Sequence, residues 1–224
     1  MTSETTYSPV AALVHAGRWD AALPLAGSIG ERAAILVDAH WWRLSGRAEA
    51  EEAVAALAAE DPVVAGYHAA VLAYTRVLFG PEPDAGDAAR AREGFAAAEA
   101  HPVLAPWAVF WQGVVADNLD GDAAAPALFS RALDAALATG DPLLESYAVR
   151  HLGGPAAERG DPAGVAMLRR SYDLRASLGA RPQTAAAAVY LAACLPEGEE
   201  AERLRTLAAA TARELGLTWL AAAG

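Results

Sequence analysis

The chain has 224 residues with a formal net charge of −11, and 54% of its residues are hydrophobic. This length suffices for one domain with a sizeable core, and the negative charge argues against nucleic acid as a partner, because phosphates require a basic surface. The single cysteine, Cys194, excludes an intrachain disulfide and a multi-cysteine zinc site. No signal-peptide pattern and no apolar run of membrane-spanning length is present, so we expect a cytoplasmic protein without a membrane segment.

The predicted elements are all helices, because alanine-rich, isoleucine-poor sequence favours helix over strand. We expect a single domain over residues 1–224. It comprises an N-terminal capping hairpin (1–27), five helix pairs (28–215) and a C-terminal cap at the other end (216–224). The first member of each pair, helix A, is expected at 28–44, 62–79, 102–119, 142–158 and 182–195. The second member, helix B, is expected at 47–60, 87–100, 122–139, 162–178 and 198–215.

The tripeptide Gly-Asp-Pro marks two of these boundaries, at residues 140–142 and 160–162. Glycine tolerates the left-handed conformation that ends a helix. Aspartate caps the free amide groups of the next helix, and proline suits the first helical position. Two such signals 20 residues apart therefore predict one complete helix between them and another helix after the second.

Equivalent residues return every 40 positions. The prolines that begin helices A are Pro62, Pro102, Pro142 and Pro182. Aromatic residues follow five positions later, at Tyr67, Trp107 and Tyr147. Small residues follow eleven positions after the prolines, at Ala73, Gly113, Gly153 and Ala193. Three columns in one phase predict a repeat protein.

The segment 152–161, LGGPAAERGD, has the pattern L-G-x-x-A-x-x-x-G-D and resembles the tetratricopeptide repeat. Residues 16–26, AGRWDAALPLA, resemble the turn and second helix of another copy, and Ala125, Phe129 and Ala132 fit the helix-B pattern. The resemblance implies an all-α, right-handed solenoid of about six antiparallel helical hairpins with a repeat of about 40 residues. It is similar to degenerate repeat regions of large bacterial transcriptional activators. This chain has no room for their DNA-binding and ATPase modules, and it lacks the lysine of a phosphate-binding loop.

The same resemblance places the helix-A residues on the concave side of the solenoid. The candidate groove for a partner is aromatic with one arginine and one histidine: Tyr67, Tyr74, Trp107, Phe110, Trp111, Tyr147, Arg150, His151 and Tyr190. The alternative is that these residues fill the core. Trp107 and Tyr147 fit both interpretations equally, whereas Phe110 and Trp111 fit the core better. For the tandem Trp41-Trp42, the helical turn of about 100° per residue predicts one core residue and one facing the groove or solvent.

We therefore predict a non-enzymatic module that binds a protein or peptide segment, without cofactor or metal and with no prediction of oligomeric state. The first alternative is a sensor that binds an apolar small molecule, which a closed pocket would favour. The second is a small helical-repeat enzyme, which would require His151, Arg150, Asp117 and Glu158 to converge within hydrogen-bonding distance. The five histidines lack the spacing of a metal site.

Overall fold

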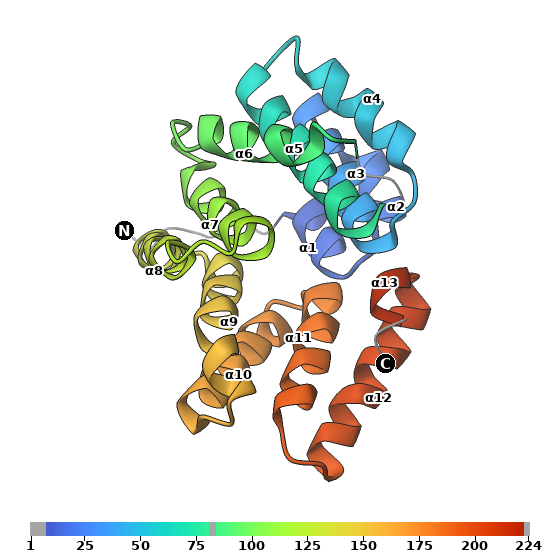
Figure 1. The fold of residues 1–224 in the computed structure, drawn as a ribbon. Coiled ribbons are helices and arrows are strands. Elements are labelled where there is room, and N and C mark those ends of the chain that lie inside the picture. Colours follow the sequence, from blue (N-terminus) through green and yellow to red (C-terminus); the bar gives the residue numbers. More distant parts are fainter. Residues whose placement is uncertain (1–7, 81–83, 222–224) are drawn as a thin grey trace, which may run out of the picture.

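The computed structural model describes residues 8–80 and 84–221, and every regular element in those residues is helical. The all-α prediction is therefore confirmed for this part of the chain (Figure 1). The elements are α1 (Pro9–His15), α2 (Trp19–Ala22), η1 (Leu23–Leu25), α3 (Ile29–Arg43), α4 (Arg47–Leu57), α5 (Pro62–Phe79), α6 (Asp87–Ala98), α7 (Ala105–Val115), η2 (Ala116–Asp120), α8 (Ala125–Thr139), α9 (Pro142–Glu158), α10 (Pro162–Ser177), α11 (Arg181–Cys194), α12 (Glu199–Leu215) and α13 (Thr218–Ala221). None of these helices is long and apolar enough to cross a membrane.

The Asp-Pro signals begin helices as the sequence predicts. Helices α5, α9 and α10 start at Pro62, Pro142 and Pro162. In each case the preceding aspartate accepts hydrogen bonds from the first turn: Asp141 Oδ1 accepts from the amide of Leu144 at 2.9 Å. The equivalent caps are Asp61 to Val63 and Val64, and Asp161 to Ala163.

The third pair deviates from the prediction at both ends of its helix A. Helix α7 begins at Ala105, three residues after Pro102, because His101 holds the intervening turn. Its Nδ1 accepts from the amides of Val103 and Leu104, both at 3.3 Å. The α-helix also ends at Val115 and continues as the π-helical turn η2, which Gly121 closes with a φ of 58°. The expected helix 102–119 is therefore shorter, and its last turn is wider.

Consecutive helices pack as pairs, and each pair contacts the next one along the chain: α3 with α4, α5 with α6, α7 with α8, α9 with α10, and α11 with α12. The small residues lie where the two helices of a pair cross closely. A Cβ built at Gly113 would lie 2.9 Å from Cε1 of Phe129 in α8. A Cβ at Gly153 would lie 2.5 Å from the Cβ of Met167 in α10. The predicted role of these two glycines is confirmed.

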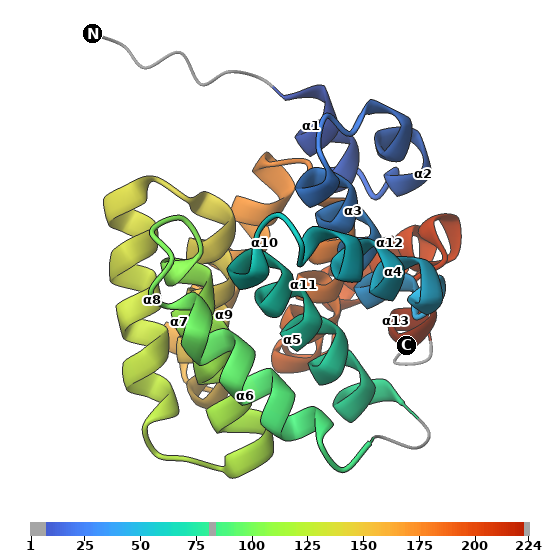
Figure 2. The same cartoon turned by 90° about the horizontal axis from the view of Figure 1, so that it is seen from above.

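The C-terminal helix α13 packs against the N-terminal helix α3. Figure 1 shows the helices running around a ring, and both Figure 1 and Figure 2 show α13 close to the N-terminal helices. The Thr218 hydroxyl donates to the carbonyl oxygen of Arg43 at 3.1 Å, and the Arg43 Nε donates to the carbonyl of Leu215 at 3.2 Å. The Trp219 ring stacks on Trp42 with the centroids 5.5 Å apart. Helix α13, which lies within the predicted C-terminal cap, thus packs against α3; residues 222–224 of that cap lie outside the described residues.

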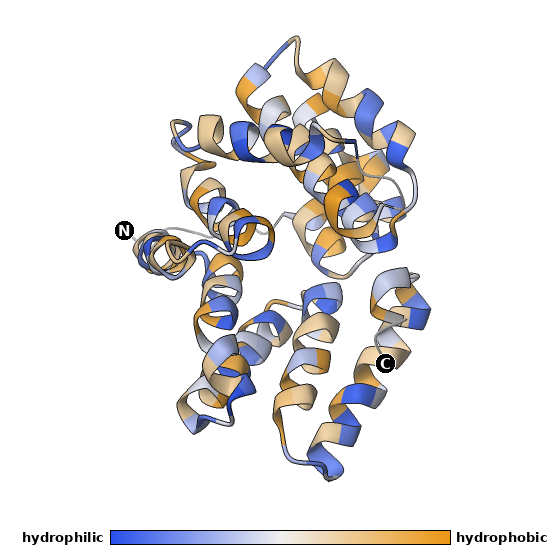
Figure 3. Cartoon of the chain, viewed as in Figure 1, coloured by the Kyte–Doolittle hydropathy of each residue, from blue (hydrophilic) through white to orange (hydrophobic). Residues whose placement is uncertain are grey.

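The hydrophobic core forms two clusters, and the second one joins the N-terminal helices to the C-terminal helices. One cluster runs from α3 to α9. The other combines Trp19, Ile35 and Trp42 from the N-terminal helices with apolar residues of α9 to α13 and the turn before α13. Figure 3 shows hydrophobic residues along all the helices and the polar, acidic start of α12 at the lower end of the view. Gly17, between α1 and α2, lies close to the end of α12: a Cβ there would come within 2.7 Å of Leu215 Cδ1.

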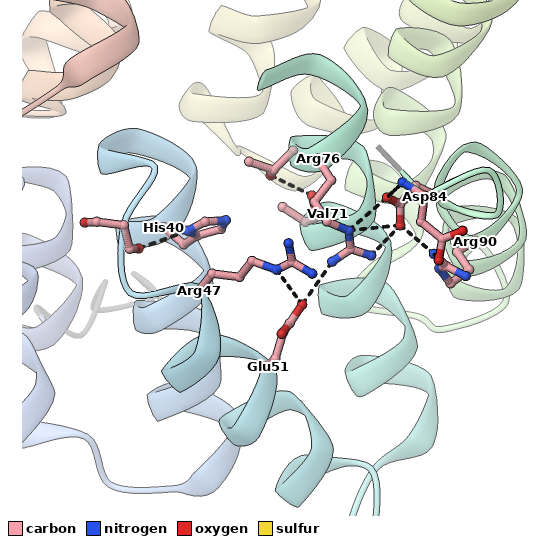
Figure 4. A network of polar contacts seen from close by, with 10 residues as sticks. His40, Arg47, Glu51, Val71, Arg76, Asp84 and Arg90 are labelled. Carbon is pink, nitrogen blue, oxygen red and sulfur yellow. Dashed lines mark hydrogen bonds and ion pairs between the residues drawn. The ribbon is translucent and has the colours of Figure 1, made fainter. Parts of the chain in front are cut away.

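An ion-pair cluster around one buried carboxylate links α4, α5 and α6 (Figure 4). Asp87 is fully buried at the start of α6. Its carboxylate accepts from Arg76 Nε at 2.9 Å and from Arg90 Nη2 at 2.7 Å. Arg76 also donates to Glu51 of α4 at 3.0 Å. The guanidinium of Arg76 holds the pKa of Asp87 well below its usual range, so this carboxylate is charged at neutral pH.

Candidate functional site

The helices A surround a cavity of about 310 Å³, here called the central cavity. The C-terminal helix α13 completes its wall with Trp219 and Leu220. The cavity reaches solvent beside Leu78 and Asn118, which are both exposed. Its lining residues are Trp41, Trp42, Tyr74, Leu78, Phe110, Trp111, Val114, Asn118, Tyr147, Arg150, His151, Arg175, Ala186, Val189, Tyr190, Ala193, Trp219 and Leu220.

A second cavity of about 260 Å³ adjoins the central cavity. Trp41, Trp111 and Tyr147 line both cavities and separate them. The remaining walls come from α3, α5, α7, the start of α9 and Gln183 of α11: Ala34, Val37, Asp38, Tyr67, His68, Val71, Leu104, Trp107, Leu143 and Gln183.

All nine residues of the predicted groove line one or both cavities. Tyr74, Phe110, Trp111, Tyr147, Arg150, His151 and Tyr190 line the central cavity, and Tyr67, Trp107, Trp111 and Tyr147 line the second cavity. Tyr67, Trp107, Tyr147 and Arg150 thus follow two adjoining cavities and not one continuous strip. Tyr67, Tyr74 and Phe110 are buried, so these three are core residues as well as cavity walls. Trp107, Trp111 and Tyr147 are only partly buried.

The aromatic walls are fixed by hydrogen bonds between successive helices A. Trp111 Nε1 donates to the hydroxyl of Tyr67 at 3.0 Å, and Asn118 Nδ2 donates to the hydroxyl of Tyr74 at 2.7 Å. Burial raises the pKa of Tyr74 to about 12, so its hydroxyl stays neutral. These contacts satisfy polar atoms that would be costly to bury alone. The rings therefore present a preformed apolar surface.

The candidate catalytic residues converge only in part. Arg150 Nη1 lies 3.2 Å from His151 Nε2, and His151 Nδ1 lies 3.9 Å from the Asp117 carboxylate, which is longer than a hydrogen bond. Glu158 instead accepts from the Tyr190 hydroxyl at 2.6 Å. The four side chains that an enzyme at this place would require do not meet at one point.

His151 is held as part of the wall. Its ring stacks on Phe129 with the centroids 4.5 Å apart and meets Phe110 edge-on. Burial lowers the pKa of His151 to about 4, so the ring is neutral at physiological pH. A neutral histidine between two phenylalanines, with Arg150 against one nitrogen, is placed to position Arg150.

Arg175 is a cavity residue that the sequence pattern did not predict, because it lies on helix B of its pair. Its side chain is 2% exposed. Nε donates to the Ser146 hydroxyl and Nη1 to the Gln183 carbonyl, both at 3.1 Å, while the guanidinium lies 4.2 Å from the centroid of Tyr147. The sequence carries a weak signal: Arg175 falls on the same helical face as the buried Leu168 and Ser171.

The sequence pattern also did not predict Asp38 of α3, and it predicted the roles of Trp41 and Trp42 only as a pair. Asp38 accepts from Trp19 Nε1 at 2.6 Å and lines the second cavity. Removal from water raises the pKa of Asp38 to about 6. Of the tandem tryptophans, Trp42 is 2% exposed and belongs to the core, whereas Trp41 lines both cavities. The division predicted for this pair is confirmed.

A larger hollow of about 660 Å³ lies between α9, α10 and the end of α11. Its charged residues are already engaged, because Arg169 pairs with Glu200 and Glu158 with Tyr190. Among the residues that the structure describes, no three His, Cys, Asp or Glu side chains are grouped to hold a metal ion. The central cavity is therefore the stronger candidate site.

A scan against protein-family models, a search of curated proteins and a search of solved structures returned no match for this chain.

Proposed function

We propose that this protein is a non-enzymatic receptor for a flat, largely apolar small molecule, which binds in the central cavity. The observation that supports this most directly is the closure of the ring, because Trp219 and Leu220 turn the aromatic faces of the helices A into the walls of one cavity. A volume of about 310 Å³ is at the lower end of the range typical of small-molecule sites. The sensor, the first alternative from the sequence, thus becomes the preferred function.

The aromatic walls favour a ring as the guest. Trp41, Tyr74 and Trp111 stack or meet edge-on, with centroids 5.4–6.1 Å apart. Aromatic guests gain both apolar burial and favourable ring geometry against such walls. The side chains are already fixed by their mutual contacts, so little conformational entropy is lost on binding.

The test is titration calorimetry with β-naphthylmethanol, a neutral, flat, two-ring compound. We expect saturable binding at one site per chain. Ala186→Phe fills the central cavity from α11 and should abolish binding, whereas Ala138→Phe, on an exposed position of α8, is the matched control and should leave it unchanged. Equal binding by the parent and by Ala186→Phe would contradict the proposal.

A second candidate is a protein or peptide segment that docks at the rim of the second cavity. It is favoured by another column with the 40-residue period: Val63 is 39% exposed, Val103 is 75% exposed, and Leu143 lines the second cavity. An apolar partner segment would cover the two exposed valines and contact the half-buried Leu143. In a pull-down from the native host, Val103→Asp should lose a specific partner that the parent chain captures.

We further propose that the hairpins are degenerate tetratricopeptide-like units arranged as a right-handed solenoid in a single domain. The equivalent crossings at Gly113 and Gly153 support this. Leucine at either glycine should overpack the crossing and cost about 1–3 kcal/mol. Chemical denaturation of both variants tests the equivalence, and a cost at only one of the two would argue against repeated units.

A further inference from the structure

The central cavity is lined by a buried cation, Arg175, that has no carboxylate partner among the residues that the structure describes. Arg175 donates through Nε and Nη1 to neutral acceptors, and its buried Nη2 has no hydrogen-bond partner among the described residues. Burying an unpaired charge is costly, so proteins normally pair it or leave it exposed. Burial lowers the pKa of Arg175 to about 10, which still leaves it protonated at neutral pH.

A second guanidinium, that of Arg150, also lines the central cavity. Arg150 lies 4.4 Å from the centroid of Tyr190 and contacts His151, which is neutral. Arg150 lowers the pKa of Arg175, so the two charges are close enough to repel one another. Neither arginine forms an ion pair with a carboxylate of the described residues, whereas Arg76, Arg90 and Arg169 all do.

Trp219, which also lines the central cavity, carries a further buried donor. Trp219 Nε1 is buried and, within the part of the chain that the structure describes, has no hydrogen-bond partner. The unpartnered groups of the central cavity thus include N–H donors on a charged and on a neutral side chain. A guest rich in acceptor oxygens would satisfy them, and a negative charge would also offset the two guanidinium groups.

We propose that the ligand of the central cavity is a planar aromatic carboxylate, whose rings contact Trp41, Tyr74 and Trp111 and whose carboxylate is held by Arg150 and Arg175. This rests on the function proposed above and specifies its ligand class. A single carboxylate suits the site better than a phosphate dianion, because most of the lining is apolar and desolvating two charges would be more costly. Arg175 comes from a helix B, so the anion site does not depend on the helix-A positions alone.

The test compares two compounds that share the naphthalene frame: β-naphthoate and the neutral β-naphthylmethanol. Titration calorimetry of the full chain should give the carboxylate at least about tenfold higher affinity, since a charge-assisted hydrogen bond contributes that much or more. Arg175→Met and Arg150→Met should each lose most of this preference, because the affinity for the carboxylate falls towards that of the same variant for the alcohol. Arg32→Met removes the same charge from an exposed position of α3 and should keep the preference.

The outcomes separate the two proposals. Equal affinity for the two compounds, or a preference for the carboxylate that survives in both cavity variants, would overturn the anion site and leave the aromatic receptor intact. If neither compound bound to the parent chain, the anion site and the aromatic receptor would both be overturned. Having two arginine variants guards against misfolding of one of them, which urea denaturation would detect.

Discussion

Arg76 and Arg175 are both largely buried, but within the part of the chain that the structure describes Arg76 has carboxylate partners and Arg175 has none. Arg76 shares Asp87 with Arg90 and also reaches Glu51, so the cluster in Figure 4 is electrically balanced and joins three helices. Arg175 is more deeply buried, at 2% exposure, and its partners are a hydroxyl, a carbonyl and the ring of Tyr147. Charges that are paired within the protein stabilise its fold, whereas an unpaired charge beside a cavity could be paired by a ligand of opposite charge.

The largest expected loss of stability follows from a substitution in the balanced cluster. Asp87→Ala leaves two arginines without their shared carboxylate and should destabilise the protein by about 3–5 kcal/mol, the usual cost of removing one partner of a buried ion pair. Urea denaturation measures the change. Asp84→Ala is the control, because the side chain of Asp84 is 65% exposed and its pairing with Arg90 is screened by solvent, so the loss should be much smaller. Similar losses in the two variants would remove the distinction between the clusters.

Acid should affect the two regions at different pH values. His151 has a folded pKa of about 4, below its ordinary value, so the unfolded chain binds its proton first and stability falls as pH drops from about 6.5 towards 4. The loss has a ceiling of roughly 3 kcal/mol. The pKa of Asp87 is depressed, so its contribution is present above the ordinary aspartate pKa and is lost only in stronger acid.

Urea denaturation of the parent and of His151→Gln near neutral pH and near pH 4.5 measures the histidine effect; the variant should lose less stability between the two conditions. His68→Gln is the matched comparison, because burial also lowers the pKa of His68 to about 4. Asp38 acts in the opposite direction. Its pKa is raised from the ordinary aspartate value to about 6, so its effect on the fold becomes more destabilising as pH rises from about 4 to about 6. A parent chain and a His151→Gln variant with the same acid response would show that His151 is not held neutral.

A smaller effect is expected at Arg175 itself. Arg175→Met removes an unpaired buried charge and keeps much of the volume, so stability should be unchanged or raised by about 1–2 kcal/mol. Arg76→Met is the matched variant and should be clearly destabilising, because Asp87 would lose its main partner. Equal destabilisation in the two variants would indicate that Arg175, too, serves the fold.

The smallest effect on stability is expected for Arg150→Met. Arg150 is partly exposed in the cavity and forms no ion pair with the described residues, so its removal should change the free energy of unfolding by less than about 1 kcal/mol. Arg32→Met provides the baseline for an exposed arginine. A loss well above that baseline would assign Arg150 to the structural class that Arg76 represents.

The helices and much of the cavity wall could be predicted from local patterns. Asp61, Asp141 and Asp161 cap helices wherever proline follows, because capping depends only on the next few backbone amides. The aromatic column at Tyr67, Trp107 and Tyr147 was found because equivalent positions in repeated units share surroundings. The shortened α7 was missed, since the imidazole of His101 holds a turn there in place of a carboxylate cap.

The sequence by itself determined where the helices begin, which residues are small enough for close crossings, and which aromatic residues return in one phase. Only the tertiary structure decided that α13 packs against α3, where Trp219 stacks on Trp42. It also decided that Arg175 is buried, whereas Arg169 and Arg170, nearby on α10, pair with glutamates. The physical reason is that a local pattern specifies the face of one helix. Burial of that face, and the absence of a counter-charge, depend on helices far away in the sequence that pack against it.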